Sequence, residues 1–145
     1  MPIVLPSDYG YVLLVAASSF FVNTLHSSLT MRARKASGIK YPAAYAANDV
    51  AEKDPLAHKF NCAQRAHANF TDNLTPFLGE LLITGLRYPI FAASAGGVWV
   101  FGRVIYAIGY TNGGPQGRTV GSIVSALTDF VLKLTAVYSA AKFVL

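Results

Sequence analysis

Three long runs of the sequence are almost free of charged side chains. Residues 9–31 contain none, residues 88–117 contain Arg103 alone, and residues 119–141 contain only Asp129 and Lys133. A helix that crosses the hydrocarbon core of a bilayer needs roughly 20 mainly apolar residues. Each run is long enough for this, so the sequence predicts three membrane-spanning helices.

A fourth segment, residues 61–88, is apolar only in its second half. Its first half carries Arg65, Asn69 and Asp72, which fall at i, i+4 and i+7 and therefore share one face of a helix. Polar groups on a membrane helix are costly unless something polar meets them. We expect this segment to be a fourth spanning helix whose polar stripe lines a site.

The predicted fold class is an all-α membrane protein, a four-transmembrane-helix bundle in a single domain over residues 1–145. Its helices are expected at 8–31, 58–87, 90–112 and 118–142, with one long loop at 32–57. Only 13% of the residues are charged, against about 25% in soluble domains, which leaves little chain for a soluble domain. A cleaved signal peptide would need basic residues before a shorter apolar run. None precedes Arg32, so the first helix should be retained.

Basic residues set the expected orientation, because cytoplasmic loops carry an excess of Lys and Arg. The loop at 32–57 and its edges are rich in them, whereas few lie near the termini or between the second and third helices. We therefore expect that loop, and the turn at residues 113–118, to face the cytosol. This distribution accounts for the net charge of +5 without a nucleic-acid partner.

The polar residues of the predicted spans allow two interpretations. Arg65 can pair with Asp72 or Asp129, and Arg103 with Glu80, in a purely structural network, because intramembrane charges usually pair. Alternatively, guanidinium groups, an amide, a carboxylate and phenols near the cytosolic half suit a small zwitterionic ligand. A metal site is not expected, since the sequence has one cysteine, Cys62, and no His-x-x-x-His or Glu-x-x-His pair. An internal disulfide is also excluded.

Two stretches resemble signatures of the MAPEG family, the membrane-associated proteins in eicosanoid and glutathione metabolism. FNCAQRAHAN (residues 60–69) is similar to the family's second-helix signature, and GRVIYAIGY (residues 102–110) to its third-helix signature. The Tyr41-Pro42 loop and the GGPQGR turn (residues 113–118) are most like the microsomal glutathione transferase type 3 branch. The resemblance extends over essentially the whole chain.

The resemblance implies a homotrimer that binds glutathione between neighbouring subunits on the cytosolic half. Arg65 and Asn69 match family residues that hold glutathione, and Tyr106 and Tyr110 match residues that line the same site. Arg118 matches the arginine credited with holding the thiolate, and Arg34 is a weaker match to an arginine near the other end of the peptide. Asp72 stands where the family usually has Glu, so it should meet the glutathione ammonium, through water if its shorter side chain does not reach.

The implied reaction needs glutathione as co-substrate and no metal. A thiol with a pKa of about 8.5 is mostly protonated at neutral pH, and a nearby guanidinium lowers that pKa by roughly 1–3. Arg118 is the expected catalytic residue, with the Tyr110 hydroxyl as a further hydrogen-bond donor to the sulfur. The thiolate would attack a lipophilic electrophile, or a lipid hydroperoxide, that arrives through the bilayer.

The expected enzyme is thus a microsomal-type glutathione transferase, with glutathione-dependent peroxidase activity as an addition. Its membrane would be the endoplasmic reticulum, or alternatively the outer mitochondrial membrane, with the active site facing the cytosol. The rival hypothesis is a non-catalytic lipid-binding scaffold of the same fold. The presence of Arg65, Asn69, the paired tyrosines and Arg118 favours the enzyme.

Overall fold

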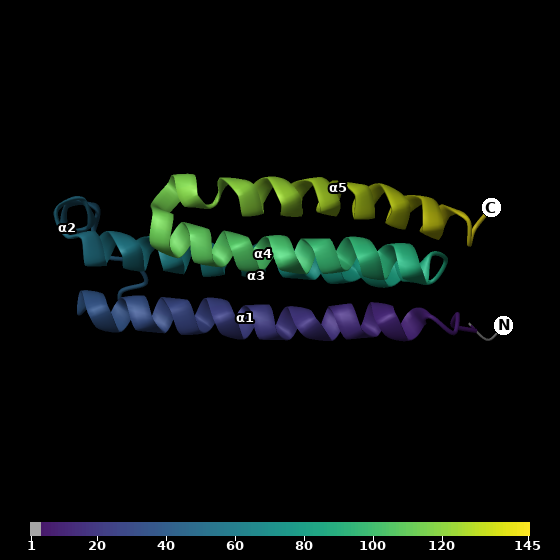
Figure 1. The fold of residues 1–145 in the computed structure, drawn as a ribbon, viewed down its shortest axis with the longest axis horizontal. Helices are drawn as coiled ribbons and strands as arrows, with labels where there is room; N and C mark the ends of the chain where they lie inside the picture. Colours follow the sequence, from purple (N-terminus) through teal and green to yellow (C-terminus); the bar gives the residue numbers. More distant parts are fainter. Residues whose placement is uncertain (1–3) are drawn as a thin grey trace.

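The protein is all-helical over the residues that the computed structural model describes, 4–145, as the sequence predicted. Four helices are long and one is short (Figure 1). They are α1 (Tyr9–Ser37), α2 (Asn48–Lys53), α3 (Pro55–Gly85), α4 (Pro89–Gly117) and α5 (Thr119–Ala141).

Local sequence signals explain where these helices begin and end. The Asp54 side chain accepts a hydrogen bond from the Leu56 N–H at 2.8 Å, and Pro55 occupies the first helical position of α3. Gly38 ends α1 in the left-handed conformation, with φ of 69°, which a residue without a Cβ adopts at little cost. The helix therefore continues past residue 31, the expected end, to Ser37.

The connection between α1 and α3 is consequently shorter than the expected loop at 32–57. It spans residues 38–54, and α2 lies within it. The basic residues Arg34 and Lys35 lie in the last turn of α1 rather than after it. Cations are favourable there because the C-terminal end of a helix carries partial negative charge, so they do not end the helix.

The four long helices lie side by side along the molecule. Figure 1 shows α1 and α5 on opposite sides of α3 and α4, and both chain ends at the end away from α2. Buried aromatic residues fill the middle of the bundle, where Phe77 stacks on Trp99 with ring centroids 3.7 Å apart. Stacked rings bury a large apolar area, and this contact joins α3 to α4.

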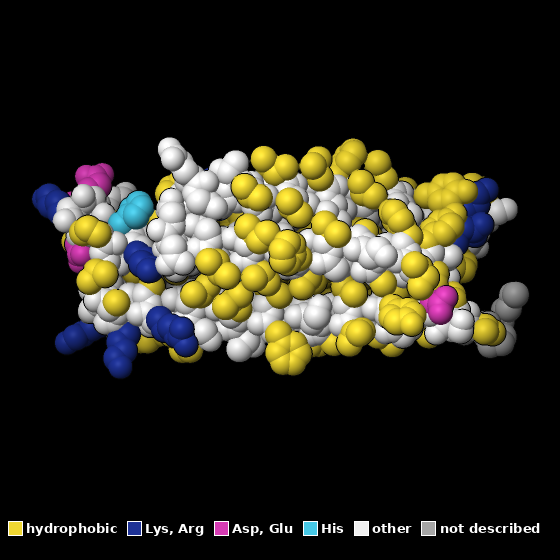
Figure 2. All heavy atoms as spheres, in the orientation of Figure 1, with side chains coloured by type: hydrophobic (Ala, Val, Ile, Leu, Met, Phe, Trp, Pro, Cys, Tyr) yellow, Lys and Arg dark blue, Asp and Glu magenta, His cyan; other side chains and the backbone are white. Residues whose placement is uncertain are grey.

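Three helices, α1, α4 and α5, are long and apolar enough to cross a membrane. Large apolar side chains are exposed along them, including Phe21, Phe101 and Val137. On the face shown in Figure 2, hydrophobic side chains cover much of the bundle, whereas Lys and Arg lie at its two ends, with more of them at the end that holds α2. Exposed apolar surface of this extent suits contact with lipid.

Glycines allow α4 and α5 to approach closely. A Cβ at Gly121 would overlap the backbone of Tyr106, and one at Gly102 would lie 2.8 Å from the Ser125 Oγ. Small residues allow this kind of contact between membrane helices. Gly114, with φ of 64°, breaks α4 near its end, so the chain turns there toward α5 (Figure 1). The sequence predicted a turn at this point.

Candidate functional site

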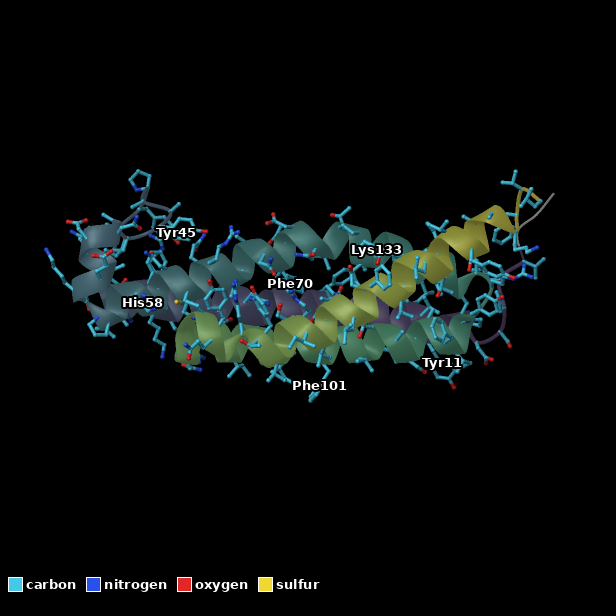
Figure 3. The ribbon with its side chains drawn as sticks, turned by 90° about the horizontal axis from the view of Figure 1, so that it is seen from above. Tyr11, Tyr45, His58, Phe70, Phe101 and Lys133 are labelled. Carbon is cyan, nitrogen blue, oxygen red and sulfur yellow. The ribbon has the colours of Figure 1, made fainter. Side chains whose placement is uncertain are left out.

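A cavity of about 320 Å³ lies at the basic end of the bundle. Its volume is at the lower end of the range for small-molecule sites, roughly 300–1,000 Å³. We call it the Arg65 cavity. Its polar walls come from the loop and α2 (Tyr45, Glu52), from α3 (His58, Asn61, Arg65) and from α4 (Tyr110). Figure 3 shows Tyr45 and His58 at this same end of the molecule.

The loop that covers the Arg65 cavity is held by two side chains. Asn61 of α3 accepts a hydrogen bond from the Ala46 N–H at 2.8 Å and donates to the Ala46 carbonyl at 3.0 Å. Arg34 of α1 donates to the Ala43 carbonyl at 2.8 Å and lies over the rings of Tyr41 and Phe60. These contacts fix the position of Tyr45 beside the cavity.

Arg118 is brought to Tyr110 by the break at Gly114. The Arg118 guanidinium carbon lies 5.0 Å from the centre of the Tyr110 ring, a distance that allows a cation–π interaction. Tyr110 in turn meets Tyr106 edge to face, with ring centroids 5.7 Å apart. A guanidinium group and two phenol rings thus follow one another along the end of α4.

Deeper in the bundle, Arg103 is buried between α3 and α4. Its guanidinium donates to the Asn69 Oδ1 at 2.9 Å and lies 4.4 Å from the centre of the Tyr106 ring. A smaller cavity of about 180 Å³, lined by Asn69, Arg103 and Asp129, adjoins this pair. The polar face of α3 therefore meets a basic group of the neighbouring helix, as a membrane-embedded amide requires.

The predicted site residues fall into two groups within one chain. Arg65 and Tyr110 line the Arg65 cavity, Arg118 contacts Tyr110, Tyr106 contacts Tyr110, and Asn69 joins them through Arg103. Asp72 is exposed on the outside of α3, and Arg34 is engaged with the loop. A contact of either residue with glutathione remains a prediction.

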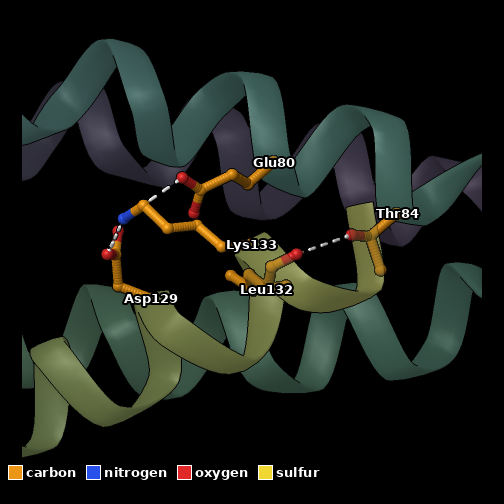
Figure 4. A network of polar contacts seen from close by, with 5 residues as sticks. All are labelled: Glu80, Thr84, Asp129, Leu132 and Lys133. Carbon is orange, nitrogen blue, oxygen red and sulfur yellow. Dashed lines mark hydrogen bonds and ion pairs between the residues drawn. The ribbon is translucent and has the colours of Figure 1, made fainter. Parts of the chain in front are cut away.

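The ion pairs differ from those considered in the structural interpretation of the sequence. Glu80 does not pair with Arg103; its Oε1 lies 3.4 Å from the Lys133 Nζ. Lys133 also pairs with Asp129, four residues earlier on α5. Figure 4 shows Lys133 between the two carboxylates, joining α5 to α3. Lys133 therefore lies beside Glu80 where Arg103 was considered, and Arg103 bonds Asn69 instead.

Residues that sequence reasoning missed are Tyr45, His58 and Cys62, which line the Arg65 cavity. Cys62 and His58 are four residues apart, and this spacing puts them on one face of α3. That spacing was a usable signal for the pair. Tyr45 carried no such signal, because the fold of the loop depends on its contacts with Arg34 and Asn61.

Among residues 4–145, no group of three or more His, Cys, Asp or Glu side chains is placed to hold a metal ion. The polar groups of the Arg65 cavity are amides, phenols, an imidazole and the Arg65 guanidinium, together with the Glu52 carboxylate. Such walls suit a zwitterionic organic molecule, because a guanidinium group binds a carboxylate with two parallel hydrogen bonds and a carboxylate can accept from an ammonium group.

Comparison with known proteins shows the family to which the chain belongs. The chain is 33% identical over 81 residues to an uncharacterized protein of Synechocystis sp., a match that covers 55% of this chain and 58% of that protein. The chain thus spans little more than half the length of this curated relative. Residues 12–138 match the model of the MAPEG family. Because this match covers most of the chain, the protein belongs to the MAPEG family and, with its three apolar helices, is an integral membrane protein.

Proposed function

We propose that the protein is a microsomal-type glutathione transferase, most similar to the type 3 branch of its family. It would join the glutathione thiolate to lipophilic electrophiles, and it would also reduce lipid hydroperoxides with glutathione. Family membership supports glutathione-dependent chemistry, and the reaction itself is inferred from the site.

The observation that carries this proposal is the position of Arg118. Its guanidinium lies over Tyr110, and Tyr110 is a wall of the cavity that also contains Arg65. In the proposed arrangement, Arg65 holds a carboxylate of the peptide and Arg118 stabilises its sulfur. Separate cations for binding and for activation are what a thiol-transfer site needs.

The other residues are assigned to binding. Asn69, Tyr106 and Tyr110 would position the peptide by hydrogen bonds, and Asp72 would meet its ammonium group, through water if needed. Arg34 would contact the far end of the peptide. Positioning of this kind contributes to catalysis because the bound thiolate and the second substrate no longer have to meet by diffusion in the correct orientation.

The chemical step begins with loss of the thiol proton, which Arg118 favours by stabilising the negative sulfur. In conjugation, the sulfur bonds to an electrophilic carbon of the lipophile. In a substitution a leaving group then departs from that carbon, and in an addition the neighbouring carbon takes a proton. In the peroxidase reaction, the sulfur attacks one oxygen of the O–O bond. This gives glutathione sulfenic acid and releases an alcohol. A second glutathione then reduces the sulfenic acid, giving glutathione disulfide and water. Neither reaction uses a metal.

A site shared between subunits of a homotrimer is part of the proposal. Asp72 is exposed in the single chain, and many apolar side chains on α1 and α5 are exposed as well. A neighbouring subunit that covers part of this surface would bring Asp72 and Arg34 to a common ligand. The bundle would then span the membrane with four helices per subunit, α3 included.

The protein is proposed to lie in the endoplasmic reticulum membrane with the Arg65 cavity facing the cytosol. The support is that more Lys and Arg lie at the end that holds α2 than at the opposite end (Figure 2), because an excess of positive charge marks the cytoplasmic side of membrane proteins. Glutathione is water-soluble and would enter from that side.

The test is conjugation by the full chain, purified and reconstituted in lipid vesicles with glutathione and a lipophilic electrophile. Mass spectrometry of the product should reveal the glutathione conjugate, and Arg118→Ala should form it at a strongly reduced rate. Binding of lipophiles with no conjugate and no peroxide reduction would instead support the lipid-binding scaffold.

A further inference from the structure

His58 and Cys62 form a pair at the entrance of the site that the proposed reaction does not use. The His58 Nε2 and the Cys62 Sγ are 3.4 Å apart on successive turns of α3. Both residues line the Arg65 cavity and also a larger outer cavity of about 880 Å³. The thiol is thus beside a group that can take its proton and next to space for a second molecule.

The outer cavity has polar features that point to a ligand. Thr111 is only 4% exposed and lines this cavity, and its Oγ1 has no hydrogen-bond partner among residues 4–145. A buried hydroxyl without a partner is costly, and a polar group of a ligand would satisfy it. The walls also carry Lys53 and Lys59 against Glu52, an excess of positive charge that favours an anionic molecule.

We propose that Cys62 is a site of reversible mixed-disulfide formation with small anionic disulfides, of which glutathione disulfide is the model. His58 takes the proton of the thiol, and the Cys62 thiolate attacks one sulfur of the disulfide. The S–S bond of the small molecule breaks, a new S–S bond joins Cys62 to one half, and the other half leaves as a thiolate that recovers the proton from His58. The net reaction converts the Cys62 thiol and the small disulfide into a mixed disulfide at Cys62 and one free small-molecule thiol.

The geometry also gives the modification a consequence. A peptide attached at Cys62 would occupy the Arg65 cavity, the outer cavity or both, because the sulfur faces each of them. Glutathione entry would then be blocked until the mixed disulfide is reduced. The disulfide chemistry itself does not depend on the proposed transferase activity.

The size of the His58 effect follows from general thiol chemistry. An opposite charge at hydrogen-bonding distance raises the thiolate fraction by about ten- to a thousandfold. The accompanying loss of intrinsic nucleophilicity cancels about half of that gain on a logarithmic scale. Replacing His58 should therefore slow the exchange by about tenfold. The burial of Cys62, at 5% exposed, opposes the charged form and makes the chain depend on this partner.

The experiment is intact-mass analysis of the full chain in lipid nanodiscs after incubation with glutathione disulfide. Because Cys62 is the single cysteine of the sequence, any adduct reports on this position, and Cys62→Ser sets the background. His58→Ala should form the adduct about tenfold more slowly than the unchanged chain. His67→Ala is the matched control, because His67 also lies on α3 but is bonded to Asn23.

A cationic disulfide, cystamine, tests the charge of the outer cavity. Relative to the urea-unfolded chain, the folded chain should favour glutathione disulfide over cystamine by about tenfold. The proposal is overturned if the folded chain forms no adduct while the unfolded chain does, if His58→Ala reacts as fast as His67→Ala, or if cystamine is preferred. The mass readout needs no turnover, so a failed transferase assay leaves it interpretable.

Discussion

Arg118 and Arg65 are assigned different roles in the proposed site. Arg118 lies over the Tyr110 ring just before α5, whereas Arg65 lies on α3, lines the Arg65 cavity and is exposed. The family likeness gives Arg65 to a peptide carboxylate and Arg118 to the sulfur. Binding and activation should therefore be separable by substitution.

Replacing each arginine by Ala tests this division. Arg65→Ala should weaken glutathione binding by roughly 10–100-fold, because it removes a charge-assisted contact of about 1.5–3 kcal/mol. Arg118→Ala should retain binding within a few-fold and lose turnover by about tenfold or more, because the thiolate fraction falls. Calorimetric binding and steady-state rates measure the two effects.

Arg87→Ala is the control, since Arg87 is exposed and lies next to Tyr88 at the far end of α3. Full activity in Arg118→Ala would contradict the assignment of the thiolate partner.

At the scale of elements, the loop between α1 and α3 is fixed by side chains of both helices. Asn61→Ala removes two hydrogen bonds to Ala46 and should destabilise the closed loop by about 1–3 kcal/mol. We expect faster limited proteolysis within residues 38–54 and weaker glutathione binding. Asn112→Ala is the matched control, because Asn112 bonds only within α4, to the Ile108 carbonyl. Equal proteolysis of the two variants would show that Asn61 does not hold the loop.

The contact between α4 and α5 gives a prediction for stability. Gly121→Ala adds a Cβ that would overlap the Tyr106 backbone, so the helices must separate at a cost of ~1–3 kcal/mol. Gly97→Ala, on α4 with open space around it, should be neutral or stabilising, because Ala favours a helix over Gly by up to about 1 kcal/mol. Unfolding in mild detergent measures both. Similar midpoints for the two variants would argue against the close approach of these helices.

Helix positions were more predictable than the site. Runs of apolar residues identified α1, α4 and α5 because membrane-spanning length is a strong constraint, and the glycine-rich turn before Arg118 was also visible. The continuation of α1 to Ser37 was not, since basic residues are compatible with a helix end as well as with a loop. Within the site, the polar stripe of α3 was evident from spacing. The contact of Asn69 with Arg103 was not predicted, and the structural alternative considered Glu80 as the partner of Arg103, because spacing along one helix does not determine pairing between helices.

For the whole molecule, the orientation in the membrane is the first question. The basic end with α2 should be accessible from the cytosol, and both termini should lie on the other side. In intact microsomes, a protease added outside should cut within residues 38–54, whereas epitope tags at either terminus should be protected until detergent is added. Protection of the loop together with exposure of the tags would contradict the orientation and the entry of glutathione from the cytosol.

The central claim is that this chain binds glutathione and converts it to the thiolate, and ultraviolet absorbance in a stopped-flow instrument measures that conversion directly. On mixing the reconstituted protein with glutathione at neutral pH, the thiolate absorbance should rise, with release of a proton, and Arg118→Ala should bind glutathione with a much smaller rise. Binding without any thiolate signal in the unchanged chain would contradict the account, and would leave the protein as a glutathione- or lipid-binding member of its family rather than a transferase.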